Sequence, residues 1–256
     1  MTEGLGPTVR QDERVKKADP NAVVDAFRAR VAESLADWEA IDQAVKLHSA
    51  PADTLRLRRR AASDSFLALV ISWESFFSSW IVAAVNRAPE QAADTLAAQL
   101  TVHATTKLNI PAAVVSKSLL ATSHLSLDAV RTILDSKGYN TTVRDHKELG
   151  ELSNAWLTGP YKVAADSLTQ HGFSPALVGR LVRNALAHES EAALKEVNKR
   201  ARGGFVKKAL RVTRIRDLDL RSWRGYLFQT PDGESHKRVA IFHQEFSDLA
   251  AALRVP

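Results

Sequence analysis

The sequence predicts an all-α protein, an up-and-down helical bundle followed by a small C-terminal β-hairpin and one further helix. Apolar residues recur every three or four positions along most of the chain, which is the spacing of one helix face. Prolines and glycines separate these stretches at positions where helices begin or end. With 256 residues, 45% of them hydrophobic, the chain can bury a sizeable core.

The N-terminal part is expected to contain a tail and two long helices. Residues 1–19 are polar and without periodicity, so they are expected to form a flexible tail. The helical bundle is then predicted over residues 20–203. Its first two helices are predicted at 21–49 and 52–87, because prolines interrupt the apolar pattern between and after them.

The second helix carries a long apolar run, residues 66–85, in which Glu74 is the single charge. A membrane span has to be weighed for such a run. A carboxylate at its middle would cost about 2.5 kcal/mol or more on insertion scales, so we predict a buried core helix and no membrane partner. A buried Glu74 needs a partner. That partner is either Arg183 from a later helix or, if the side chain lies at the helix surface, water.

Shorter helices and a C-terminal segment follow. The C-terminal region, 204–256, is expected to form a basic segment, a hairpin and a terminal helix, because two β-prone runs flank a Pro-Asp-Gly-Glu turn. The predicted helices are 90–108, 112–121, 126–134, 144–157 and 160–170, and the hairpin and last helix are 223–242 and 244–254.

A single long amphipathic helix is predicted from Ser174 to Gly203, with Ser174 as its N-cap. On it, Asn184 and His188 are four residues apart and share one face, with Arg183 beside them. Arginine, an amide and an imidazole are the groups needed to hold a phosphate and move its proton. The alternative is a solvated polar edge with a half-buried histidine.

The string Arg183-Asn184-x-x-x-His188, late in a helical chain, resembles the R-N-x-x-x-H motif of the HEPN superfamily. The resemblance covers about residues 63–202, and the setting of Glu74 is similar to that in HEPN domains of the RiboL-PSP type. It implies a HEPN-like bundle and a metal-independent endoribonuclease that leaves 2′,3′-cyclic phosphate ends. It also implies a homodimer with a composite active site, and a toxin or phage-defence effector controlled by an antitoxin or defence-system partner.

The resemblance also implies roles for the motif residues. His188 would act as general base or acid, Arg183 would offset charge in the transition state, and Asn184 would orient His188 or bind a phosphate oxygen. Glu74 would have a supporting role. A catalytically inactive HEPN-like module that binds RNA, nucleotide or protein is the main alternative, and a helical interaction protein with an accidental motif is another.

The charge suggests an acidic partner such as nucleic acid, and the resemblance implies that this partner is RNA. The net charge is +6, with a pI near 9.6. The following residues are expected to contact RNA, unless they form only a solvated face: Lys199, Arg200, Arg202, Lys207, Lys208, Arg211 and Arg214. A second cluster, Arg56 with Arg58, Arg59 and Arg60, is open to the same two interpretations.

Other function classes are disfavoured. The chain has no cysteine, and Ala192 stands where a zinc-protease motif beginning at His188 would need its second histidine. No glycine-rich phosphate loop is present. We therefore expect neither a metal nor a cofactor. Because no apolar segment follows the first charges, a cytoplasmic protein is expected.

Overall fold

The computed structural model describes residues 17–108, 126–135, 140–188, 190–212 and 220–256, and over these ranges the protein is all-helical, as predicted. The predicted helix 112–121 and most of the predicted tail lie outside them. The helices are α1 Pro20–His48, α2 Pro51–Arg87, α3 Glu90–Lys107, α5 Leu127–Leu134, α6 His146–Trp156, α7 Gly159–Ser167, α8 Ser174–His188, α9 Glu191–Arg200, α10 Leu220–Phe228 and α11 Arg238–Ala252, with a 3-10 turn at Lys208–Leu210.

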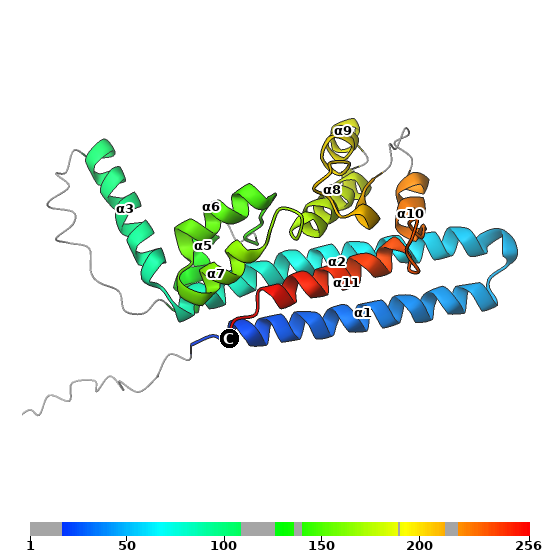
Figure 1. The fold of residues 1–256 in the computed structure, drawn as a ribbon, viewed down its shortest axis with the longest axis horizontal. Coiled ribbons are helices and arrows are strands. Elements are labelled where there is room, and N and C mark those ends of the chain that lie inside the picture. Colours follow the sequence, from blue (N-terminus) through cyan, green and yellow to red (C-terminus); the bar gives the residue numbers. More distant parts are fainter. Residues whose placement is uncertain (1–16, 109–125, 136–139, 189, 213–219) are drawn as a thin grey trace, which may run out of the picture.

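Three long helices form the centre of the fold. Helices α1 and α2 run antiparallel, and α11 lies along both of them (Figure 1). Aromatic rings from all three meet between them: Trp73 of α2 lies 5.8 Å from Phe27 of α1 and 5.2 Å from Phe246 of α11, ring centroid to ring centroid. Helices α8 and α10 pack on further parts of α2, so α2 is the element that positions the rest.

Helix α2 is the one helix, among the described residues, that is long and apolar enough by length and composition to cross a membrane. In the fold, 56% of its most apolar 18-residue window is buried. A core helix that is covered on several sides has the same composition, so this property alone does not indicate a span.

The predicted single helix 174–203 is two helices. α8 ends at His188, and α9 begins at Glu191 after Ser190, whose hydroxyl accepts a 3.2 Å hydrogen bond from the amide of Ala193. Serine is a strong N-cap, because its oxygen satisfies an amide that has no partner within the helix. Helix α9 therefore packs back against α8 instead of extending it.

The predicted C-terminal hairpin was wrong. Both of its strands are helical, in α10 and at the start of α11. Trp223, Tyr226 and Leu227 are spaced for one helix face and are buried, so packing overrides the β-propensity of the aromatic residues. The turn itself forms: the amide of Glu234 donates to the carbonyl of Pro231 at 3.0 Å, and Gly233 has φ 85°. It joins two helices rather than two strands.

Two buried polar clusters connect α11 to the first two helices. Asp42 accepts hydrogen bonds from Arg58 at 2.7 Å and Lys237 at 3.1 Å. His243, which is fully buried, lies with its Nε2 3.2 Å from the Ser34 hydroxyl and 3.3 Å from the Ser65 hydroxyl. These contacts fix the rotation of α11 between α1 and α2.

Candidate functional site around the end of α8

The predicted motif residues lie at the C-terminal end of α8. Arg183 and Asn184 are half-buried, while His188 is exposed on the last turn. The guanidinium of Arg183 donates to the side-chain oxygen of Asn184 at 2.9 Å. The preceding apolar residues, Leu181 and Val182, are buried against the core, so this helix is fixed and its polar edge faces outward.

Glu74 and Arg183 form the ion pair that the sequence suggested as one alternative. The distance from Arg183 Nη2 to Glu74 Oε2 is 3.4 Å, with 31% and 18% of the two side chains exposed. The pair joins α8 to the middle of α2. It supplies the partner that a carboxylate in an apolar run needs, and it holds the arginine beside Asn184.

The serine side of α2 receives the segment that precedes α6. Asn140 donates to the Ser75 hydroxyl at 3.3 Å, and the amide of Thr141 donates to the Ser78 hydroxyl at 3.1 Å. These serines follow Glu74 by one and four residues. The segment therefore passes along α2 near the Glu74–Arg183 pair, before its chain turns into α6.

Arg180 extends the polar edge of α8, since residues 180, 184 and 188 are spaced four apart. Its Nη2 donates to the carbonyl of Arg144 at 3.3 Å, whereas its buried Nε has no hydrogen-bond partner among the described residues. Burial, and then the neighbouring charge of Arg200, lower the pKa of Arg180. An arginine in such surroundings is suited to an added anion.

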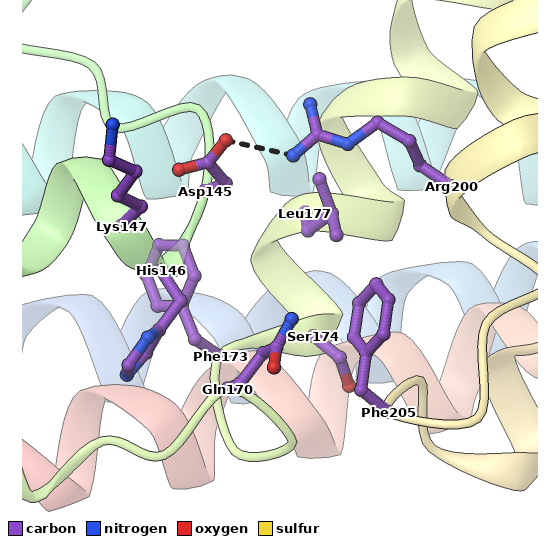
Figure 2. A pocket seen from close by; sticks show the side chains of 9 residues that line it. All are labelled: Asp145, His146, Lys147, Gln170, Phe173, Ser174, Leu177, Arg200 and Phe205. Atoms are coloured by element: carbon purple, nitrogen blue, oxygen red, sulfur yellow. Dashed lines mark hydrogen bonds and ion pairs between the residues drawn. The ribbon is translucent and has the colours of Figure 1, made fainter.

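A pocket of about 320 Å³ lies between α6, α8 and α9 (Figure 2). Asp145 and Arg200 reach toward each other across it, 2.9 Å apart. The remaining lining residues are His146, Lys147, Gln170, Phe173, Ser174, Leu177 and Phe205. The pocket is thus part aromatic and part polar. None of the three motif side chains lines it.

Asp145 is held in this pocket as a carboxylate. It caps α6 by accepting from the amide of Glu148 at 3.1 Å. That backbone hydrogen bond, together with the one from Arg200, outweighs burial and lowers the pKa of Asp145. Ser174 closes the other side: it begins α8 as predicted, but its hydroxyl donates to the carbonyl of His171 and accepts from the amide of Lys207.

The predicted RNA-binding cations that the structure describes differ in their exposure and in their partners. Lys199, Arg202 and Lys208 are exposed. Arg200 is paired with Asp145 and Glu196, and Lys207 is paired with Glu245. The guanidinium of Arg211 bonds to the backbone carbonyls of Gly204 and Val206. Arg214 lies outside the described residues.

Asp145, Arg180 and the pocket were not among the predicted site residues. The Arg144-Asp145-His146-Lys147 stretch reads as a polar turn, although Asp145 with Glu148 three residues later is typical of a helix N-terminus. That pattern could have located Asp145 at the start of α6. Its pairing with Arg200 depends on a distant helix, for which the local sequence has no signal.

Within the described ranges, no group of three or more His, Asp or Glu side chains is placed to hold a metal ion. The side chains that are present at the end of α8 can donate hydrogen bonds, carry positive charge and exchange a proton. That combination suits binding and general acid–base chemistry on a phosphate ester.

No protein-family model matches this chain. No curated protein and no solved structure matches it either.

Proposed function

We propose that the protein is a metal-independent endoribonuclease of the HEPN type. The observation that carries the proposal is the arrangement at the end of α8: Arg183 is held by Glu74 and Asn184, and His188 is exposed one turn further along. His188 would take the proton of a ribose 2′-hydroxyl or give one to the leaving 5′-oxygen. Arg183 would bind the phosphate that carries the developing charge.

The reaction that this supports is an internal transfer. The 2′-oxygen attacks the adjacent phosphorus, and the bond from phosphorus to the 5′-oxygen breaks. The products are a 2′,3′-cyclic phosphate and a 5′-hydroxyl, and the proton lost by the 2′-hydroxyl is balanced by the one gained by the leaving oxygen. DNA lacks the nucleophile and would not be cut.

The decisive experiment compares the wild type with His188→Ala on labelled RNA in EDTA, with the fragment ends mapped. We expect cleavage by the wild type, cyclic phosphate ends, and a loss of at least about 100-fold in the variant, because removing a general acid or base costs on the order of 10² to 10⁴ in rate. His48→Ala is the matched control, since His48 is also an exposed histidine in the last turn of a helix. Full activity of His188→Ala would refute the assignment.

A homodimer with a composite site is part of the proposal, because the exposed end of α8 leaves room for a second copy of the same helix. Sedimentation velocity at the concentrations of the cleavage assay tests it: we expect a dimer, and a monomer that cleaves at full rate would exclude a shared site.

The proposal includes a role as a toxin or defence effector. Expression of the wild type in the cytoplasm should then arrest growth, whereas expression of His188→Ala should not, and an antitoxin-like partner should relieve the arrest.

A catalytically inactive module that binds RNA, nucleotide or protein is the second candidate. One observation favours it: the guanidinium of Arg183 is already engaged by Glu74 and Asn184, so a phosphate has to share or displace these partners. RNA binding by the wild type without any cleavage would select this candidate. The accidental-motif alternative loses support, because His188 faces solvent rather than the core.

A further inference from the structure

The four arginines near the start of α2 have different surroundings in the fold. Arg58 turns to the buried Asp42, and Arg60 lies 3.7 Å from Asp64. Arg56 and Arg59 instead line a separate pocket together with Arg224 of α10, which packs across this part of α2 (Figure 1). Two helices far apart in sequence thus bring three guanidinium groups to one place.

The pocket is lined by apolar and cationic side chains. Its volume is about 430 Å³, and its lining residues are Ala52, Leu55, Arg56, Arg59 and Arg224. The four from α2 fall at helical spacing on one face of that helix. Leu55 is 49% exposed, so apolar surface is open beside the arginines. Ligand pockets of this size accept a molecule as large as a nucleotide.

The positive charge in this pocket is not balanced within the described part of the chain. Arg56 has an exposed ion pair with Asp53, at 2.8 Å. Arg59 and Arg224 have no ion pair with a described residue, and the Nε of each is buried without a hydrogen-bond partner there. Buried donors that lack acceptors, carried by like charges, are unfavourable unless an anion joins them.

We propose that this pocket binds a phosphate group. Arginine presents a planar fork of donors that matches phosphate oxygens, and two such forks from different helices can grip one phosphate or two adjacent ones. The apolar lining residues, Ala52 and Leu55, would contact the sugar or another less polar part of the ligand. The site is separate from the end of α8: Arg59 and Glu74 are 15 residues apart on α2, about 22 Å along the helix axis. It does not depend on the cleavage proposal.

Titration calorimetry with pyrophosphate tests this site, at an ionic strength of about 0.15 M so that exposed charges outside the pocket are screened. We expect the wild type to bind, and Arg59→Gln and Arg224→Gln each to weaken the dissociation constant at least about tenfold, because each removes one charged fork. Arg60→Gln is the control, since it removes the same charge from the same cluster outside the pocket; it should stay within about twofold. Thermal melts of all variants confirm folding, and the two test variants lie on different helices.

The phosphate has two sources, a free nucleotide or the backbone of an RNA strand. A nucleoside diphosphate and a short single-stranded RNA are therefore added as competitors of pyrophosphate. Displacement of pyrophosphate from the wild type by one of these competitors identifies the source of the phosphate. The site is supported if that competitor binds the wild type but not Arg59→Gln. Absence of pyrophosphate binding by the wild type, equal weakening by Arg60→Gln, or displacement by neither competitor would each overturn the proposal.

Discussion

Asp42 is a single acid shared by two cations from different helices. Its side chain is 7% exposed, and it bonds to Arg58 of α2 and to Lys237 at the start of α11. Lys237 also lies over the ring of Phe228, 3.7 Å from its centroid. Burial alone would raise the pKa of Asp42, but the hydrogen bonds from Arg58 and Lys237 outweigh it and lower the pKa.

Asp42→Asn should lower the free energy of unfolding by about 3 kcal/mol, because it leaves two cations together without their acid. Urea unfolding measures this. Asp53→Asn, which breaks the exposed pair with Arg56, should change the free energy of unfolding by less than about 1 kcal/mol. Equal effects of the two variants would contradict the buried role of Asp42.

The contribution of Asp42 also depends on pH. Since the folded pKa of Asp42 is lowered, its stabilising contribution is present above the unfolded pKa of about 3.9 and is lost as the pH falls through the folded pKa.

The buried His243 should make the free energy of unfolding depend on pH in a range above that of Asp42. Burial lowers its pKa, while its Nδ1 lies 2.8 Å from the carbonyl of Val239. The unfolded chain therefore takes up a proton below about pH 6.5 that the folded protein resists, and stability falls with decreasing pH by up to about 1.4 kcal/mol per unit. His243→Gln should flatten the stability curve between about pH 7 and pH 5. The control His48→Ala should keep the slope, and an unchanged slope in His243→Gln would exclude this explanation.

Part of the site could be predicted at the level of residues. Glu74 is the single charge in a 20-residue apolar run, so a partner was required, and Arg183, the arginine of the motif, was one of the two alternatives. The pairing of Asp145 with Arg200 could not be predicted in this way. Both have other plausible partners nearby in sequence, and only the reversal of the chain between α8 and α9 brings them together.

At the level of elements, the contact between α8 and α11 can be tested at one glycine. A methyl group added at Gly179 would lie 2.8 Å from the ring of Phe246, which is fully buried. Gly179→Ala should therefore destabilise the protein by about 1–3 kcal/mol, as overpacking does. Gly150→Ala is the control: a methyl group there meets nothing within 4 Å, and alanine favours helix α6 by up to about 1 kcal/mol. Equal stabilities in urea unfolding would show that α11 can move away.

The helices were the most predictable elements, because periodicity and prolines mark them directly. Helices α1 and α2 begin and end within about one residue of the predicted positions. The hairpin failed because aromatic and β-branched residues favour strands locally, whereas α10 and α11 bury the same residues on helical faces. The break before α9 was marked by Ser190, but an apolar stripe continuing through Leu194 concealed it.

For the whole molecule, the buried hydrophobic residues form one continuous cluster from Val24 of α1 to Val255. We therefore expect a single cooperative unfolding transition. In urea unfolding, tryptophan fluorescence and far-UV circular dichroism should give the same midpoint. Phe246→Ala should lower the free energy of unfolding by about 3–5 kcal/mol when it is measured by either signal. Leu100→Ala, at a site 53% exposed, should shift neither midpoint. Two separate transitions would instead indicate independent units.

The position of α11 between α1 and α2 affects how the protein is made. Helix α11 is synthesised after every helix that it contacts, and 150 residues separate Arg87 from Arg238. At a synthesis rate of about 5–20 residues per second, α11 begins to be made roughly 8–30 s after α2 is complete, and until then it cannot cover the apolar faces of α1 and α2. During this time Phe66 and Trp73 of α2 lack the rings of Phe242 and Phe246 that pack against them in the finished fold. The nascent chain should therefore depend on chaperones until α11 has left the ribosome.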